Sequence, residues 1–185
     1  KNEAAKKYGV KTTDTVWKAK LKCPEIVFVP PRHKLYEQIS ARVNAVYNTY
    51  TDYVEPYSID ESFLDMTGAP AFYGMTAEEL ADALRARIRE EIGITISVGV
   101  SYNKAFAKIG SDYKKPDATT VITEDNYRDI LWPLPVTDLL YVGKAAAEVL
   151  RRKYVSTIGD LAKLDKGILI QWLGKIGGQL WEYAN

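Results

Sequence analysis

The chain has 185 residues, 46% of them hydrophobic, which is enough for one domain of ordinary size or two small ones. Its 25 Lys and Arg against 24 Asp and Glu leave a formal net charge of +1, which neither favours nor excludes a nucleic-acid partner. No run of about 18 apolar residues exists, so a membrane-spanning helix is excluded, and the single cysteine, Cys23, excludes an internal disulfide or a thiolate zinc site and favours a reducing, cytoplasmic setting.

Charge is distributed unevenly along the chain. Residues 1–34 carry nine Lys and Arg against three Asp and Glu, whereas residues 35–123 carry eight against thirteen. A basic segment beside an acidic one suits a site where cationic side chains and a carboxylate-bound metal share a phosphate ligand, although solvated Lys-rich helix faces would give the same composition. The chain opens without Met and without the apolar segment of a signal peptide, which indicates a fragment of a longer protein.

The first 32 residues are expected to form a small segment of helices and loops. A helix is predicted over residues 2–8, because Gly9 stands where a glycine is favoured after a helix end. A second helix is predicted over residues 15–21. Residues 26–29 have the β-branched and aromatic composition of a short strand.

Helices and strands alternate from residue 33 onward. Apolar residues at spacings of three and four predict a helix over 33–52. The capping-box sequence Thr76-x-x-Glu79 opens another helix that ends near Gly93, and Asn103 is placed to cap a third. Strand-forming residues predict strands at 54–58, 62–66, 94–101 and 119–122. This order predicts an α+β fold, a sheet backed by helices, that is compatible with a ferredoxin-like arrangement.

The character of the chain changes after Trp132-Pro133-Leu134-Pro135, where no strand-like run remains. Short helices are expected there, separated by glycines at positions 143, 159, 174, 177 and 178. This pattern predicts a second, all-helical unit with a boundary near residues 123–135. The segment from Leu173 to Gly178 fits a helix-packing turn and a phosphate-binding hairpin equally well.

Two adjacent carboxylates, Asp60 and Glu61, lie between the strands predicted at 54–58 and 62–66. Neighbouring carboxylates are costly to keep ionised together unless a cation neutralises them. Mg²⁺ prefers one or two carboxylates plus phosphate oxygens, and a two-metal site clamps the attacking and leaving oxygens of an in-line displacement. A polar turn explains the dipeptide alone, but its strand-like flanks favour half of a metal-dependent phosphoryl-transfer site.

Lysines follow in the segment from Ser97 to Pro116. Backbone N–H groups and Lys104 are expected at the start of its helix, where anions bind. Lys115 is expected at the other end, just before a proline. A lysine beside a triphosphate offsets its charge during phosphoryl transfer. Lys108 and Lys114 are expected to lie on a solvated face.

Two segments, Tyr57–Asp65 and Val98–Pro116, resemble the internal motifs of Y-family translesion DNA polymerases. The first matches Ser-hydrophobic-Asp-Glu, and the second matches Asn-Lys-x-x-Ala-Lys followed by Lys-Pro. The resemblance implies partial fingers at 1–32, a ferredoxin-like polymerase palm at 33–123 and a small all-α helix-hairpin-helix thumb at 124–185. It also implies template-directed nucleotidyl transfer in DNA damage bypass, with two Mg²⁺, primer-template DNA and dNTP.

The resemblance also assigns roles to individual residues. Asp60 and Glu61 are similar to palm carboxylates that bind metal, with Glu61 near the primer hydroxyl, and Lys115 is similar to the lysine that contacts the incoming triphosphate. In the fingers, a Tyr and an Arg of the family contact the triphosphate, and here Glu3 and Lys6 stand at those positions. Lys6 can meet a phosphate as a point charge without a bidentate fork, whereas Glu3 cannot donate a hydrogen bond.

The segment from Leu139 to Arg152 resembles the helix-hairpin-helix of the family's thumb. Gly143 lets the backbone approach a phosphate, and the helix start after it offers N–H donors. Lys144 adds positive charge, and Lys153 is a further candidate. A glycine-containing turn between packed helices is the alternative, and we favour DNA contact by Gly143 and Lys144.

Parts of the family pattern are not found in this chain. The first metal-binding Asp, the little-finger domain and the clamp-binding tail are expected in other parts of a whole protein, where a sliding clamp would bind. The fragment alone is therefore expected to bind DNA weakly and not to polymerise. One alternative is a non-catalytic DNA-binding paralogue, suggested by Glu3 and by the lost Asp. Another is a nucleotidyl cyclase-like palm, against which the DNA-binding hairpin argues.

Overall fold

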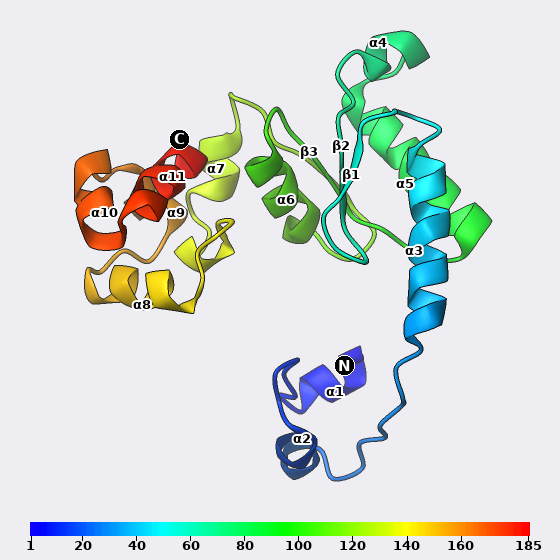
Figure 1. Ribbon diagram of the computed structural model, residues 1–185, viewed down its shortest axis with the longest axis horizontal. Helices are drawn as coiled ribbons and strands as arrows, with labels where there is room; N and C mark the ends of the chain where they lie inside the picture. The colour runs from blue at the N-terminus through cyan, green and yellow to red at the C-terminus, as the bar shows by residue number, and fades with distance from the viewer. The chain divides into compact units, whose positions relative to one another are not determined.

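The computed structural model describes residues 1–185 and forms two compact units, Lys1–Tyr36 and Glu37–Asn185. Figure 1 shows the first unit as two short helices at the blue, N-terminal end of the chain. They are α1 (Glu3–Lys7) and α2 (Val16–Lys22), which confirms both predicted helices to within one residue at each end. A small apolar cluster holds them together, formed by Ala5, Val10, Ala19 and Cys23 with Ile26.

The strand predicted at residues 26–29 is wrong. These residues have no regular secondary structure, and Val27 and Val29 are 82% and 79% exposed. A strand depends on hydrogen bonds to a neighbouring strand, and no other segment pairs with this one. The β-branched composition therefore indicates a local preference for extended backbone, but the segment has no neighbouring strand to pair with.

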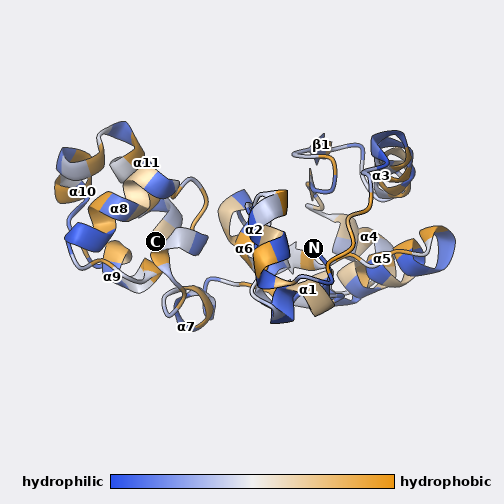
Figure 2. Cartoon of the chain, turned by 90° about the horizontal axis from the view of Figure 1, so that it is seen from below, coloured by the Kyte–Doolittle hydropathy of each residue, from blue (hydrophilic) through white to orange (hydrophobic).

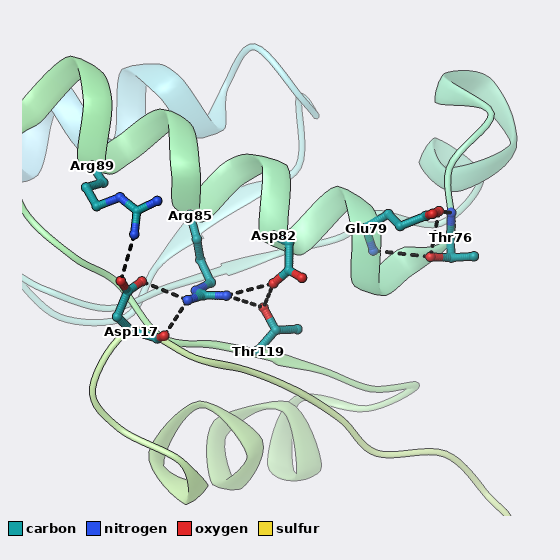
Figure 3. Close-up of polar contacts among 7 residues, drawn as sticks. All are labelled: Thr76, Glu79, Asp82, Arg85, Arg89, Asp117 and Thr119. Atoms are coloured by element: carbon teal, nitrogen blue, oxygen red, sulfur yellow. Dashed lines mark hydrogen bonds and ion pairs between the residues drawn. The ribbon is translucent and has the colours of Figure 1, made fainter.

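Two long helices, α3 (His33–Tyr47) and α5 (Ala77–Ile92), pack together. α3 begins in the first unit, continues into the second and ends before the position that its periodicity predicts. The capping box of α5 is confirmed: Thr76 Oγ1 accepts from Glu79 N at 3.2 Å, and the Glu79 carboxylate accepts from Thr76 N at 2.8 Å (Figure 3). The contact between the helices is a buried aliphatic cluster of Val43, Val46, Leu84 and Ile88.

Four short strands form two separate sheets. β1 (Val54–Pro56) pairs antiparallel with β2 (Ser62–Leu64), and β3 (Val98–Val100) pairs parallel with β4 (Thr119–Val121). The mixture of helices and strands agrees with the predicted α+β class, but the structure has two sheets where one was predicted. Each strand is also shorter than its composition predicts, because regular pairing with a partner extends over only three residues of each strand.

α6 (Lys104–Tyr113) connects β3 to β4 and packs against both strands. Asn103 caps it as predicted, with Oδ1 accepting from Phe106 N at 2.8 Å. Glycine is required where strand and helix touch, because a Cβ on Gly99 would lie 1.9 Å from the Ala107 carbonyl oxygen. This close approach fixes α6 against the strand, and with it the lysines that α6 carries.

The C-terminal part is helical, as predicted, and its only β pairing is an isolated bridge between Pro135 and Thr157. Its elements are α7 (Tyr127–Leu131), the 3₁₀-helix η1 (Val136–Asp138), α8 (Lys144–Arg152), α9 (Ile158–Ala162), α10 (Lys166–Leu173) and α11 (Lys175–Ala184). A further short helix that was not predicted, α4 (Ala69–Tyr73), lies between β2 and α5. Fully buried aliphatic residues form the core of the C-terminal part, namely Leu139, Leu150, Ile158, Leu161, Leu169 and Leu180.

α10 and α11 approach each other closely. A Cβ on Gly177 would lie 2.0 Å from the Leu169 carbonyl oxygen, so only glycine fits there. Gly174 joins the two helices with a φ of 68°, a left-handed conformation that glycine adopts readily. Both glycines therefore serve the turn and the helix contact, which favours the packing interpretation of residues 173–178.

The tryptophans lie in two regions. Trp17 of α2 is 67% exposed, whereas the other three pack against the C-terminal helical core, namely Trp132, Trp172 and Trp181. The indole N–H of Trp132 donates to the Ala184 carbonyl at 3.1 Å, which joins the region of α7 to the end of α11. Residues 37–123 contain no tryptophan.

None of the helices combines the length and the apolar character needed to cross a membrane. Figure 2 shows hydrophilic residues interspersed with hydrophobic ones along α3 and α5. That alternation is typical of helices with one buried face and one face in water.

Candidate functional site

Asp60 and Glu61 lie in the turn that joins β1 to β2, which confirms their predicted position between two strands. The Glu61 carbonyl accepts from Tyr57 N at 2.9 Å and from Ser58 N at 3.1 Å, and these bonds close the turn. Ser58 Oγ donates to Asp60 Oδ1 at 2.8 Å and lies 3.5 Å from Glu61 Oε2. The hydroxyl of Ser58 therefore contacts both carboxylates.

Glu61 is the first member of a chain of alternating charges that leads to Lys115. Lys108 Nζ of α6 lies 2.8 Å from Glu61 Oε1 and 2.5 Å from Asp112 Oδ2. The other Asp112 oxygen, Oδ1, pairs with Lys115 Nζ at 2.6 Å. The structure therefore brings a predicted metal-binding carboxylate and the predicted triphosphate lysine into one cluster, through two residues between them.

The expectation that Lys108 is solvated is wrong. Its side chain is 19% exposed, compared with 51% for Lys115. Burial opposes the charged ammonium, but hydrogen bonds to Asp112 and Glu61 outweigh it and raise the pKa of Lys108. Burial likewise favours the neutral form of Asp112, but hydrogen bonds from Lys108 and Lys115 lower the pKa of that carboxyl. Lys108 and Asp112 are thus held in their charged forms, whereas Lys114 is exposed as expected.

Lys104 lies at the start of α6, as predicted, and is held by the β1–β2 hairpin. It pairs with Glu55, and its ammonium lies 5.5 Å from the centre of the Phe63 ring, a cation–π distance. These residues line a cleft of about 380 Å³ that also includes residues of α11 and of the turn before α8. There Tyr141 and Tyr183 stack with ring centroids 5.9 Å apart.

Lys115 begins the turn that leads from α6 to β4. Asp117 of this turn has a φ of 49°, an uncommon conformation for a residue other than glycine. Arg85 of α5 donates to Asp117 Oδ1 at 2.8 Å and to Asp82 Oδ1 at 2.7 Å (Figure 3). Burial opposes the charge of this guanidinium, but the bonds to the two aspartates outweigh it and raise the pKa of Arg85.

Lys6 lies in the first unit, on α1, whereas the other predicted site residues lie in the second. It forms an ion pair with Glu3 three residues earlier, and both side chains are exposed. The two residues at the positions expected to contact a triphosphate therefore neutralise each other in this conformation.

Gly143 and Lys144 begin α8. Gly143 is the N-cap residue, with φ −76° and ψ 175°, and no side chain caps the helix. The first N–H groups of α8 are therefore left for an outside acceptor. Lys144 is exposed and forms no ion pair. A free cation beside uncapped N–H groups is an arrangement that binds anions such as phosphate.

The two carboxylates fit part of a divalent-metal site. Asp60 is exposed, and only Ser58 contacts its carboxylate. No cluster of three or more His, Cys, Asp or Glu side chains exists that could hold a metal alone. Because Mg²⁺ takes one or two carboxylates with phosphate oxygens and water, this donor set suits a cation that is bound together with a nucleotide.

Residues 1–112, more than half of the chain, match the model of a family described as impB/mucB/samB. The chain belongs to the impB/mucB/samB family. Two curated relatives are DNA polymerase IV of Acetivibrio thermocellus, 50% identical over 185 residues, and DNA polymerase IV of Clostridium acetobutylicum, 39% identical over 185 residues. Both alignments cover all of this chain and 46% of the relative, so the chain spans about half the length of these proteins.

Solved structures agree with this membership of the impB/mucB/samB family. The crystal structure of DinB from Sulfolobus solfataricus matches with a TM-score of 0.86 and 32% identity, over 99% of this chain and 54% of that one. A Y-family DNA polymerase chimera, Dbh-Dpo4(243-245)-Dbh, matches with the same TM-score, identity and coverage. The resemblance to Y-family polymerases is therefore confirmed, together with the mixed α/β fold.

In this member of the impB/mucB/samB family, sequence reasoning missed two residues that connect the site. Lys108 and Asp112 join Glu61 to Lys115. Their spacing of four along α6 is a signal for an ion pair on a helix and could have identified that pair. The contact with Glu61 has no local signal, because it depends on a turn in a distant part of the chain.

Proposed function

We propose that this chain is part of a translesion DNA polymerase and carries two carboxylates of its active site. Residues 33–123 form the palm, of ferredoxin-like type, and residues 1–32 form part of the fingers. Residues 124–185 form the helix-hairpin-helix thumb. The whole protein adds deoxynucleotides to a primer, including opposite damaged template.

The observation that carries this proposal is the cluster that runs from Asp60 and Glu61 to Lys115. Carboxylates that bind a divalent metal and a lysine that meets a triphosphate are two components of phosphoryl-transfer sites. The names of the relatives, DNA polymerase IV, support the same reaction. They give no support to a nucleotidyl cyclase.

Each site residue has a role that follows from its chemistry. Asp60 and Glu61 hold Mg²⁺, two ions per complete site, which when bound neutralise the charge that develops as a primer hydroxyl attacks a dNTP. Lys115 offsets the charge of the triphosphate, and Lys6 adds a second positive charge from the fingers. Lys108 orients Glu61 through their 2.8 Å contact.

Gly143 and Lys144 bind a phosphate of the primer-template DNA. The uncapped start of α8 supplies N–H donors, and the ammonium of Lys144 supplies charge. Such contacts position a duplex without reading its sequence. A sliding clamp binds the whole protein outside the residues of this chain.

Primer extension by the full-length protein tests the catalytic assignment. We expect Asp60→Asn and Glu61→Gln each to lower the rate by about a thousandfold, because electrostatic groups at a reacting centre contribute on that scale. Asp52→Asn is the matched control, since Asp52 is exposed and forms no ion pair, and it should keep full activity. Normal extension by the Asp60→Asn protein would refute the proposal.

DNA binding by the 185-residue chain tests the thumb assignment. We expect Lys144→Ala to weaken binding to a primer-template and to reduce the slope of log affinity against log salt by about 1. Lys175→Ala is the control, because Lys175 also follows a glycine at the first position of a helix, α11. Equal losses in both variants would argue against a specific contact at α8. The chain alone should not extend the primer.

A second candidate is a non-catalytic DNA-binding paralogue used in damage tolerance. The ion pair between Glu3 and Lys6 favours it, because it occupies the positions that contact the triphosphate in the family. If the protein is such a paralogue, we expect its full-length form to bind primer-template DNA but to incorporate no nucleotide. Single-nucleotide incorporation that requires Asp60 would exclude it.

A further inference from the structure

The turn that carries Lys115 is held by charged residues of a helix that is distant in sequence. Arg85 Nη2 donates to Asp117 Oδ1 at 2.8 Å, and the same nitrogen donates to the Asp117 carbonyl. Arg89, one helical turn later on α5, donates Nη1 to Asp117 Oδ2 at 3.2 Å. Figure 3 shows both arginines reaching from α5 to this residue, so both of its carboxylate oxygens are engaged.

Asp117 is held in a conformation that the chain alone disfavours. Its φ of 49° lies in the left-handed region, which is unfavourable for a residue other than glycine, though less so for Asp and Asn. The next residue is anchored as well, because the Ala118 carbonyl accepts from Val98 N at 2.9 Å. The turn is therefore fixed on one side by α5 and on the other by β3.

Arg85 is shielded from solvent while it makes these contacts. Its side chain is 18% exposed, compared with 60% for Arg89. Through Nη1 it also binds Asp82 on its own helix, and Asp82 accepts from Thr119 Oγ1 at 2.6 Å. Charge-assisted hydrogen bonds that are partly shielded from water define geometry better than exposed surface pairs do.

We propose that Arg85 and Asp117 are positioning residues for the ammonium of Lys115. Neither touches a substrate, and both act by fixing the backbone from which Lys115 extends. A lysine carries a point charge at the end of a flexible side chain. The position of its backbone therefore limits which phosphate oxygens its ammonium can reach. Asp112 holds the other end of that side chain at 2.6 Å. This inference rests on the proposed role of Lys115 in binding the triphosphate.

Single-nucleotide insertion by the full-length protein tests the inference. Asp117→Gly removes both ion pairs at a position where glycine adopts the backbone conformation without cost. We expect it to raise KM for the dNTP about tenfold and to change kcat less than about twofold, the pattern of lost ground-state binding. Asp117→Asn keeps a neutral acceptor and tolerates the same conformation, so it should restore most of the loss.

Asp82→Ala is the matched control, because it also removes a carboxylate paired with Arg85 but leaves the turn intact. We expect it to lower the thermal unfolding temperature about as much as Asp117→Gly does, while KM for the dNTP stays within about twofold of wild type. Equal KM values for the two variants would overturn the inference, because the network would then only join α5 to β4.

A double-mutant cycle with Lys115→Ala separates this inference from the proposed function. If Asp117 acts through Lys115, adding Asp117→Gly to Lys115→Ala should raise KM no further. Additive effects, or a Lys115→Ala defect without any Asp117→Gly defect, would overturn the positioning role alone. A wild-type protein that cannot extend a primer would overturn the proposed function, and the positioning role with it.

Discussion

A single lysine connects the two halves of the candidate site. Lys108 contacts Glu61 on the β1–β2 turn and Asp112 on its own helix, and its side chain is largely shielded from solvent. Removing its charge would leave Glu61 without its cation, whereas Asp112 would keep its ion pair with Lys115. Lys114, near the end of α6, makes no such contact and is exposed, so the two lysines form a natural comparison.

We expect Lys108→Met to lower the free energy of unfolding by about 1 kcal/mol, at the upper end of the range for partly exposed ion pairs. Lys114→Met should change it by less than about 0.5 kcal/mol, as is usual for surface substitutions. Urea denaturation of the 185-residue chain measures both. Equal stabilities of the two variants would mean that the Glu61 contact adds nothing to folding.

The phenol of Tyr47 gives the stability an alkaline pH dependence. Burial at the end of α3 raises the pKa of Tyr47 from 10.0 to about 12. Between pH 10 and 12 the unfolded chain therefore ionises this residue while the folded chain keeps it neutral, so stability is complete below pH 10 and is lost as the pH rises toward 12.

Tyr47→Phe should reduce this alkaline loss by on the order of 2 kcal/mol, the free energy that corresponds to the pKa difference. Urea denaturation at pH 9 and at a pH near the folded pKa measures it. Tyr154→Phe serves as the control, because Tyr154 is 92% exposed. If both phenylalanine variants lose stability in parallel with wild type, burial of Tyr47 does not control the effect.

At the scale of elements, two adjacent glycines of α11 have opposite expected effects. A Cβ on Gly177 would lie 2.0 Å from the Leu169 carbonyl oxygen, which is backbone and cannot move aside. A Cβ on Gly178 would meet only side chains, Ile170 at 3.3 Å and Lys166 at 3.6 Å, and Ile170 is 45% exposed and free to shift.

We therefore expect Gly177→Ala to lower the free energy of unfolding by about 3 kcal/mol, as forced overpacking does. Gly178→Ala should raise it by up to about 1 kcal/mol, because alanine is the better helix former. Thermal and urea denaturation of the two proteins give the comparison. Similar free energies of unfolding for the two variants would show that α10 and α11 can move apart without loss of stability.

Helix ends were predictable from sequence because their signals are local. Thr76 with Glu79, and Asn103 alone, cap α5 and α6 as their spacing indicates. Strands were less predictable, because a strand exists only where a second segment pairs with it. Residues 26–29 have strand composition without a partner, and the other strands extend only as far as their partners do.

In the candidate site too, features that depend on neighbouring residues were predictable, and contacts between distant segments were not. The position of Asp60 and Glu61 in a turn between strands followed from their neighbours in sequence. The contact of Glu61 with Lys108 did not, because it requires α6 to pack closely on β3 at Gly99. The membership of the family could be inferred from the motifs, but the cluster that joins them could be seen only in the structure.

At the scale of the whole molecule, the first compact unit is joined to the second near residue 36. Arg32 precedes α3, is exposed and has no regular secondary structure. Exposed segments of this kind are the preferred sites of proteolysis. The two units therefore do not share one cooperative core. We expect each unit to unfold independently of the other.

We expect trypsin to cleave first after Arg32 and to leave residues 33–185 as a resistant product. That product should unfold within about 2 °C of the intact chain, since a larger shift would correspond to a measurable change in free energy. Mass spectrometry identifies the product, and calorimetry gives both unfolding temperatures. A strongly lowered temperature would mean that the first unit stabilises the second.

The placement of the tryptophans gives this protein a built-in optical signal. Three of its four indoles pack in the C-terminal helices and the fourth is exposed on α2, while residues 37–123 contain none. Tryptophan fluorescence therefore has no probe in the segment that carries Asp60 and Lys115. A change of emission on adding nucleotide would therefore report a structural change around one of these indoles, rather than occupancy of the site near Asp60 and Lys115.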